Sequence, residues 1–253
     1  MLDQTFDNIE IVVVVDPIDS ETYDQSTLSV LDNYRDDKRL KIYLNRVRMG
    51  FVRSLNKAIL LSKGDLIARA DSDDVYHRKR IEEQLYYLQN HQLDVVGSWA
   101  KIIDENNRVL GMWITPVRSE DILSVLPFHT CFIHSSVMTK RDTIIRCGLY
   151  SAEYFGAEDY FLWYKIAAKG GRLGNVPQFL TFYRIKHGSI LRNFKNFFVQ
   201  RSNYLKVKVN ILRDPYFRNI IKGSKRLLVL LQGAGAVFVP PYVDDCAKRV
   251  FFY

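Results

Sequence analysis

The run IEIVVVV, residues 9–15, constrains the fold of this chain more than any other segment, because it is mainly β-branched and ends at Asp16-Pro17. A short continuous apolar run predicts a strand buried on both faces, as the strands of parallel sheets are. Apolar runs and amphipathic stretches then alternate along the chain as far as residue 183. This alternation predicts an α/β fold: a Rossmann-type mixed, mostly parallel sheet flanked by helices.

The same patterns predict the other elements. Further strands are expected at residues 40–44, 65–70, 93–100, 136–139 and 176–183, with a hairpin between residues 101–104 and 108–114. Helices are expected at residues 24–37, 50–62, 78–90, 119–126 and 158–169. Two of these helices run into glycine, at Lys63-Gly64 and Gly170-Gly171, which is a common way for a helix to end.

The charge of the chain is unevenly distributed. The formal net charge is +8, but residues 1–186 hold 24 Lys and Arg against 25 Asp and Glu, or −1, whereas residues 187–253 hold 12 against 3, or +9. We therefore expect one domain over residues 1–190 and a basic, mainly helical C-terminal region over residues 191–253. Such an excess is typical of a segment that meets an anionic membrane surface, and equally of a solvated helical face.

Cysteine usage and the chain ends indicate a compartment. The three cysteines, Cys131, Cys147 and Cys246, show no CxxC spacing, so neither a disulfide framework nor a zinc site is expected, and a reducing cytosol fits best. The first ten residues are acidic and polar, unlike a signal peptide. Residues 226–243 are too polar and broken by prolines to span a bilayer, but are suited to lie on its inner surface or to pack on the domain.

An acidic cluster, Asp71, Asp73 and Asp74, follows the predicted strand at residues 65–70. Ligands bind beyond the carboxyl ends of strands in open α/β sheets. A helix N-cap explains one carboxylate but not three. A calcium loop of the EF-hand type requires glycine where this chain has Tyr76. A divalent cation, Mn²⁺ or Mg²⁺, shared with a diphosphate explains the cluster best, because such ions are typically held by one or two carboxylates plus phosphate oxygens.

Four segments together resemble family 2 glycosyltransferases, which are inverting enzymes with the GT-A fold. They are NRVRMGFVRSLNKAILLSKGDLIARADSDD (residues 45–74), which contains the DxD motif, the Ile133–Ser136 stretch, GAEDYFLWYKIAAKGG (residues 156–171) and Tyr183-Arg184-x-x-His187. They occur in the family's order and the resemblance covers roughly residues 1–190. A DxD motif alone would be weak support.

The resemblance implies roles on the donor side of such an enzyme. Asp73 would ligate the metal ion, Asp71 would share it or approach the ribose, and His187 would add a metal or phosphate contact. Asp16 would contact the nucleotide base. The nucleotide-sugar would also be bound by Asn45, Asn56 and Arg69, although Arg69 can equally serve as a structural ion pair.

On the acceptor side, Asp159 would be the general base, with Glu158 beside it in the catalytic pair, and His134 and Ser135 would line the acceptor. The other explanation of Glu158 and Asp159 is that negative charge is favourable at a helix N-terminus. The implied reaction moves a hexose from a nucleotide-sugar, with a UDP-sugar as the expected donor, to a glycan or lipid-linked hydroxyl in cell-surface polysaccharide biosynthesis. The enzyme would be cytoplasmic, at the inner face of the plasma membrane.

The chain departs from the family pattern in two places. Family members begin with a further strand before a helix that ends like residues 2–6, so this domain is expected to be N-terminally truncated, with the neighbouring strands left unpaired. Asp-Pro-Ile-Asp replaces the usual Asp-Asp-Gly-Ser after the first predicted strand. An inactive, truncated binding or scaffold protein therefore stays an alternative. A nucleotidyltransferase would need a glycine-rich phosphate loop, and a nucleic-acid partner a recognised motif; neither is found.

Overall fold

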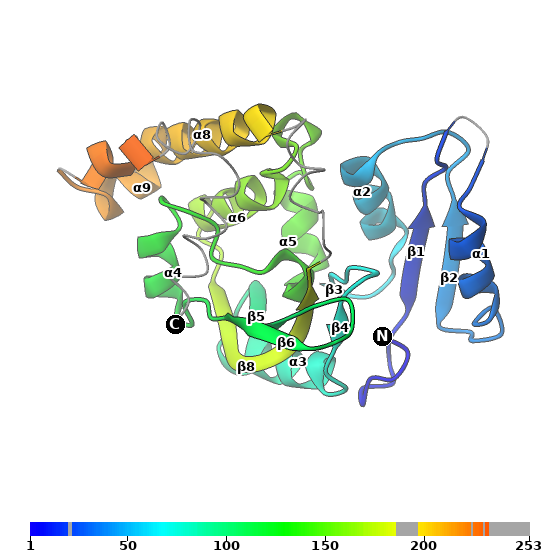
Figure 1. The fold of residues 1–253 in the computed structure, drawn as a ribbon. Coiled ribbons are helices and arrows are strands. Elements are labelled where there is room, and N and C mark those ends of the chain that lie inside the picture. Colours follow the sequence, from blue (N-terminus) through cyan, green and yellow to red (C-terminus); the bar gives the residue numbers. More distant parts are fainter. Residues whose placement is uncertain (20–21, 186–196, 224, 230, 233–253) are drawn as a thin grey trace.

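The computed structural model describes residues 1–19, 22–185, 197–223, 225–229 and 231–232, and its elements form a sheet with helices packed around it (Figure 1). The strands are β1 (Ile11–Val15), β2 (Leu40–Leu44), β3 (Leu66–Ala68), β4 (Val75–Tyr76), β5 (Val95–Ile103), β6 (Val109–Trp113), β7 (Met138–Lys140) and β8 (Leu173–Arg184). The helices are α1 (Gln25–Asp32), α2 (Phe51–Leu61), α3 (Arg80–Asn90), α4 (Ser119–Val125), α5 (Arg141–Arg146), α6 (Glu158–Ala168), α8 (Phe197–Arg213) and α9 (Pro215–Ile220). Two 3₁₀ turns, η1 (His134–Ser136) and η2 (Ala152–Tyr154), complete the order.

The main sheet has six strands in the order β3-β7-β5-β8-β4, with β6 paired to the second half of β5. Among the described strands, β5 and β8 pair in parallel, as do β1 and β2, and the other four pairings are antiparallel. The expected α/β fold with a mixed sheet flanked by helices is confirmed, but the expectation that it is mostly parallel is wrong. The short β3, β4, β6 and β7 join it as antiparallel neighbours, which local apolar runs do not reveal.

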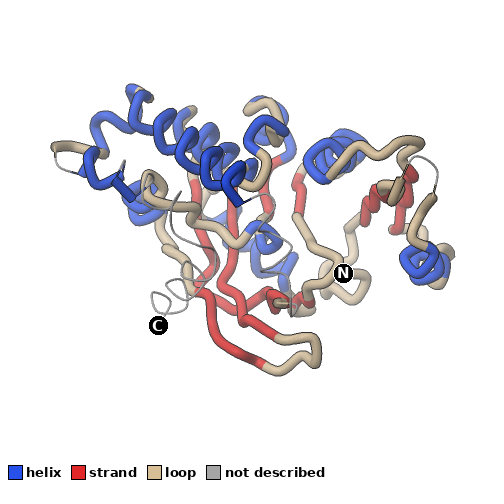
Figure 2. The backbone as a smooth tube through the Cα atoms, turned by 45° about the horizontal axis from the view of Figure 1, so that its top comes forward, coloured by secondary structure: helices blue, strands red, loops and turns tan. Residues whose placement is uncertain are grey.

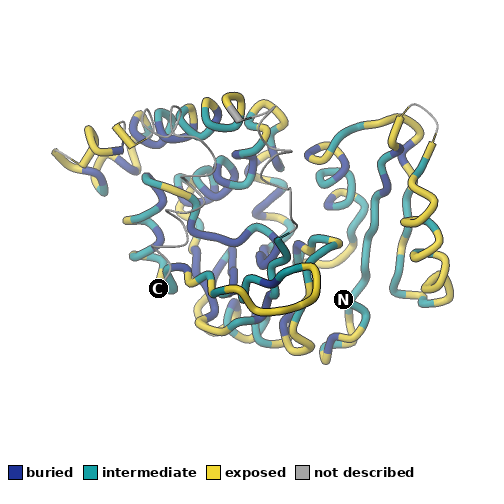
Figure 3. The backbone as a smooth tube through the Cα atoms, viewed as in Figure 1, coloured by how far each residue is buried: buried dark blue, intermediate teal, exposed yellow. Residues whose placement is uncertain are grey.

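β1 and β2 form a separate two-stranded sheet. In the described part of the chain β1 pairs with β2 alone and β3 with β7 alone, so each of these strands has one edge without a strand partner. The expectation that the β1 run is buried on both faces is wrong: Ile11 to Val14 are only partly buried, and Val15 is the buried member. Figure 3 shows that β1 and β2 are less buried than the central strands of the main sheet.

The principal core lies between the main sheet and α6. Trp163 and Leu162 of α6 are fully buried there. The same cluster includes Val207 and Ile211 of α8 and Phe217 of α9, so the C-terminal helices share the core of the sheet (Figure 2). The predicted boundary near residue 190 lies outside the described residues.

Several expected elements differ in extent. α1 covers only the first half of the helix predicted at residues 24–37, because the polar Asn33 ends it, and α3 begins two residues later than predicted. α5, β4 and the two 3₁₀ turns were not predicted, since each is too short to show a periodic pattern. No described helix combines the length and apolar character needed to span a bilayer.

Candidate active site

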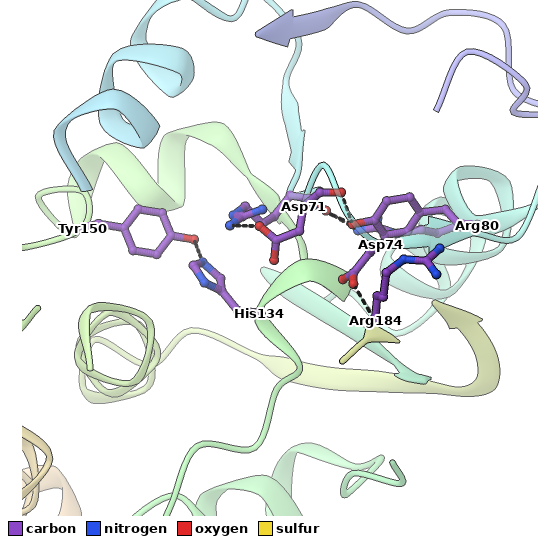
Figure 4. Close-up of polar contacts among 8 residues, drawn as sticks. Asp71, Asp74, Arg80, His134, Tyr150 and Arg184 are labelled. Atoms are coloured by element: carbon purple, nitrogen blue, oxygen red, sulfur yellow. Dashed lines mark hydrogen bonds and ion pairs between the residues drawn. The ribbon is translucent and has the colours of Figure 1, made fainter. Parts of the chain in front are cut away.

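The acidic loop, residues 71–74, lies between β3 and β4 and turns back on itself. The amide of Asp71 donates to the hydroxyl of Tyr76 over 2.6 Å, and the amide of Asp74 donates to the carbonyl of Asp71 over 3.4 Å. β3 therefore delivers the three carboxylates to one edge of the main sheet. Figure 4 shows this loop with its cationic neighbours.

Arg80, at the start of α3, is a fully buried cation beneath the loop. Its Nη2 atom donates to the carbonyls of Arg69, over 2.7 Å, and of Val137, over 3.3 Å, while Nε donates to Gln84 over 2.9 Å. The guanidinium also lies 4.5 Å from the centre of the Tyr76 ring. Burial lowers the pKa of Arg80 to about 10, so it stays charged at neutral pH. Sequence reasoning missed this residue, because nothing in a helix pattern marks an arginine that points inward.

Arg69 is the second compensating cation, and it lies at the centre of the site. Its side chain is 8% exposed, and Nη2 pairs with the Asp71 carboxylate over 2.5 Å. The ring of Phe51, the first residue of α2, lies 5.4 Å from the guanidinium. Burial raises the pKa values of Glu158 and Asp159, and the charge of Arg69 opposes this rise without cancelling it. The acidic loop, α2 and α6 therefore meet around one guanidinium.

Arg184, at the end of β8, fastens the loop to the β5–β6 hairpin. Its amide donates to Asp74 Oδ1 over 2.8 Å and its Nε to the carbonyl of Asp73 over 2.7 Å. Nη1 and Nη2 donate to the Asp104 carbonyl over 2.7 Å and to Asn107 Oδ1 over 2.8 Å. This residue stands in the Tyr-Arg-x-x-His signature, but no sequence pattern indicated which groups it would bind.

The other side of the loop contacts η1. Burial raises the pKa of Asp74, and the nearby Ser135 hydroxyl opposes that shift. His134 shares a 3.0 Å hydrogen bond with the Tyr150 hydroxyl, and its ring packs edge-on against Trp163. Burial lowers the pKa of His134 well below its usual range, so the imidazole is neutral. The predicted acceptor residues thus form a buried wall next to the acidic loop.

Glu158 and Asp159 begin α6, as predicted. Glu158 is buried, and the Asp159 carboxylate accepts the Tyr160 amide over 2.7 Å, at the positive end of the helix. Burial, and then the charge of Glu158, raise the pKa of Asp159 to about 7. A carboxyl group with a pKa near 7 is suited to exchange a proton at physiological pH.

Asp16 organises the start of α2. Its carboxylate accepts the amides of Met49, over 2.9 Å, and Gly50, over 2.6 Å, and the Asn45 side chain over 2.8 Å. Burial opposes ionisation, but these donors hold the pKa of Asp16 below its ordinary value. Gly50 has a φ of 81°, which favours glycine, and it places Phe51 over the site. In this structure Asp16 and Asn45 therefore position α2.

Asn56 makes a two-way contact within the protein. Its Nδ2 donates to the carbonyl of Tyr150 over 2.8 Å, and its Oδ1 accepts the amide of Tyr150 over 3.0 Å. Asn56 thereby joins α2 to the loop that supplies the partner of His134. A direct contact of Asn56 with a nucleotide-sugar stays a prediction.

Most of the predicted site residues converge, but not all can be placed. Arg69 lies near Asp71, His134, Glu158 and Asp159, while Asp73, Asp74 and Ser135 are brought together at the acidic loop. Asp16 and Asn45 hold the start of α2, and Asn56 lies within that helix. His187 lies outside the described residues.

The acidic loop fits a divalent cation that is only partly held by protein. Among the described residues, no group of three or more His, Cys, Asp or Glu is placed to hold a metal ion unaided. Asp71 and Asp73 provide carboxylate oxygens, the ligands that Mg²⁺ and Mn²⁺ prefer. Mg²⁺ is usually bound by one or two carboxylates with substrate phosphates, so this donor set fits a metal that arrives with a diphosphate.

Comparison with known proteins identifies the family of the chain. The profile of the family described as "Glycosyl transferase family 2" matches residues 1–148. The chain belongs to this family. The O-antigen biosynthesis glycosyltransferase WbnJ of Escherichia coli is 32% identical over 193 residues, covering 75% of this chain and 73% of WbnJ. WfaP of Escherichia coli, named a UDP-Glc:α-D-GlcNAc-diphosphoundecaprenol β-1,3-glucosyltransferase, is 29% identical over 206 residues, covering 81% of this chain and 77% of WfaP.

Solved structures show the same fold. Staphylococcus aureus TarS, residues 1–349, in complex with UDP-GlcNAc matches with a TM-score of 0.68 at 17% identity, over 93% of this chain and 66% of that one. The Pyrobaculum calidifontis mannosyltransferase PcManGT, in complex with GDP-Man and Mn²⁺, matches with a TM-score of 0.59 at 18% identity, over 98% and 73%. The present chain covers a smaller part of the length of some other relatives, such as 60% of an uncharacterised Haemophilus influenzae glycosyltransferase.

The raised pKa of Asp159 predicts a stability change with pH. The folded-state pKa of about 7 exceeds the ordinary value of 3.8, so the folded protein binds the extra proton between these pH values and loses stability as pH rises through that window. Asp159→Asn removes this penalty, so its melting temperature should exceed that of the parent at pH 8, by roughly 2–4 °C for each kcal/mol removed in a chain of this size.

The difference between the Asp159→Asn variant and the parent should shrink as pH is lowered to 5. Asp142→Asn, in the first turn of α5 and exposed, is the matched control and should follow the parent throughout. A parent that is more stable than Asp159→Asn at pH 8 would contradict the assignment of a destabilised carboxylate.

Proposed function

We propose that this chain is an inverting, metal-dependent hexosyltransferase that moves a sugar from a UDP-sugar to a hydroxyl of a lipid-linked glycan. The observation that carries the proposal is the placement of two carboxylate sets close to the one guanidinium of Arg69. One set, on the acidic loop, is ion-paired and accessible to a metal–diphosphate. The other contains a carboxyl group with a pKa near 7. An inverting transfer requires both a stabilised leaving group and a base.

On the donor side, Asp73 and Asp71 would hold Mn²⁺ or Mg²⁺. The ion, when bound, would neutralise the charge that develops on the leaving diphosphate. Arg69 lies against Asp71 and is positioned to turn to the diphosphate once the carboxylate has a metal as its partner. Asp16, Asn45 and Asn56 keep α2 and Phe51 in place at this side, and His187 remains a proposed additional ligand.

On the acceptor side, Asp159 would take the proton of the attacking hydroxyl as its oxygen forms the new bond to the anomeric carbon. The bond to the diphosphate breaks on the opposite face, so the configuration inverts in one displacement. Glu158 contributes by its charge, which raises the pKa of Asp159 toward the working pH. His134 is neutral and partly buried, so it and Ser135 would shape the acceptor site rather than transfer protons.

The proposed substrates follow the relatives. WfaP is named for a UDP-sugar donor and a diphosphoundecaprenol acceptor, and TarS was solved with UDP-GlcNAc. WbnJ is named for O-antigen biosynthesis, which supports a role in cell-surface polysaccharide synthesis. PcManGT was solved with Mn²⁺, which supports the proposed metal. We place the reaction at the cytoplasmic face of the membrane, where the basic C-terminal region would meet anionic lipid.

Transfer activity should depend on Asp159. Asp159→Asn keeps the shape of the side chain but removes the base, so turnover of a UDP-sugar should fall by roughly 10²–10⁴-fold with donor binding unchanged. For the parent, kcat should rise with pH through about 7, where Asp159 loses its proton. Asp142→Asn is the control. Unchanged turnover in Asp159→Asn would favour the alternative, a non-catalytic scaffold with this fold.

The acidic loop should bind UDP only together with a metal ion. UDP and Mn²⁺, present at about 100 times their dissociation constant, should stabilise the protein by about 2.7 kcal/mol, a rise in melting temperature of roughly 5–10 °C. EDTA should abolish the rise, and so should Asp73→Asn. Asp121→Asn, an exposed carboxylate on α4, serves as the control. A rise that persists in EDTA would exclude the metal from the donor site.

A further inference from the structure

A short helix beyond α9 is held to the protein by one side. Residues 225–229 and 231–232 are helical, and Val229 is fully buried in the principal core. Arg226 donates to the carbonyl of Leu212 over 2.8 Å, and Gln232 accepts a hydrogen bond from Lys208 of α8 over 3.1 Å. These contacts fix the orientation of the helix on the end of α8.

The side that faces away from the protein carries leucines. Leu227, Leu228 and Leu231 are 59%, 55% and 58% exposed. At 3.6 residues per turn, these positions fall within an arc of about 100°, so they form one stripe. Single exposed leucines are ordinary, but a contiguous stripe on an anchored helix marks an interaction surface. We call these three residues the leucine stripe.

Cations surround the leucine stripe. The exposed basic residues near it are Arg213, Arg218, Lys222, Lys225 and Arg226. The only carboxylate in residues 213–232 is Asp214, and its oxygens accept the Tyr164 hydroxyl over 2.9 Å and the Tyr216 amide over 2.8 Å. The patch is therefore apolar at its centre and positive at its edge.

We propose that the leucine stripe and its cations form a docking face for an anionic lipid bilayer. The leucines would enter the boundary between head groups and acyl chains, and the cations would meet the lipid phosphates. A second copy of the chain fits less well, because a two-fold contact would bring two positive edges together. Residues 233–253 hold two acidic and two basic residues, so they offer no excess of negative charge to pair with the patch.

The docking face is coupled to the base-bearing helix. α8 packs on α6 through Tyr204 and Tyr160, whose ring centres are 5.4 Å apart, and Asn203 donates to the carbonyl of Phe155 over 3.1 Å. Tyr164 of α6 reaches Asp214 directly. A bilayer bound at the stripe would therefore hold α6 at a defined position relative to the membrane. This last point rests on the proposed function, since it matters for a lipid-linked acceptor; the docking itself does not.

Vesicle co-sedimentation of the full chain tests the proposal. The parent should bind vesicles of phosphatidylcholine mixed with phosphatidylglycerol, and bind phosphatidylcholine alone much more weakly. The triple change Leu227→Ser, Leu228→Ser and Leu231→Ser should lower the partition coefficient at least about tenfold, since most of the buried apolar area is lost. Lys222→Glu with Lys225→Glu should remove the preference for the anionic lipid, and added salt should weaken parent binding.

The matched control changes three other exposed leucines, Leu44, Leu60 and Leu110, which are 45%, 55% and 60% exposed, to serine, and it should bind as the parent does. A parent that does not bind anionic vesicles would overturn the proposal, as would a stripe variant that binds like the parent. A parent that is dimeric by light scattering, and a stripe variant that is monomeric, would also overturn it and assign the face to a second copy.

The melt with UDP and Mn²⁺ separates the two proposals, because the stripe variant should keep the full response. A parent that binds vesicles without responding to UDP would refute only the transferase.

Discussion

The site depends on the compensation of clustered negative charge by two buried guanidinium groups. Three carboxylates in four residues would repel one another and the pair at the start of α6. Arg69 pairs with Asp71 and lies close enough to Glu158 and Asp159 to lower their pKa values. Arg80 holds the backbone of Arg69 from below. The charge of Arg69 thus offsets part of the repulsion between the two carboxylate sets.

The compensation is incomplete at Asp159. Burial and the charge of Glu158 raise the pKa of this carboxyl group by more than the charge of Arg69 lowers it. The remaining structure must therefore hold a destabilised carboxylate in place. It does so by packing α6 on both sides, with Trp163 against Phe132 in the core and Tyr160 against Tyr204 of α8. α8 thus supports α6, and the short helix that carries the leucine stripe is hydrogen-bonded to α8.

Sequence patterns predicted the parts of the site whose chemistry is local. Asp71, Asp73, Glu158 and Asp159 stand next to one another in motifs, and the alternation of apolar runs predicted the α/β fold. Arg80 and Arg184 were not predicted as site residues, because they donate to carbonyl oxygens that lie far away in the chain and that no local pattern encodes. The burial of β1 was overestimated because a run of β-branched residues reports what a strand can bury and not what neighbours surround it. Asp16 and Asn56 proved to have partners within the protein, which only tertiary packing decides.

The most direct test of this account is a crystal structure of the chain with UDP and Mn²⁺, in which anomalous scattering locates the ion. We expect one Mn²⁺ bound by Asp73, shared with or adjacent to Asp71, with the diphosphate on the side of Arg69 that faces Asp159. The ion pair between Arg69 and Asp71 should then be broken or lengthened from 2.5 Å. An ion bound elsewhere, or a diphosphate that makes no approach to Arg69, would contradict the claim that this guanidinium joins the donor site to the base.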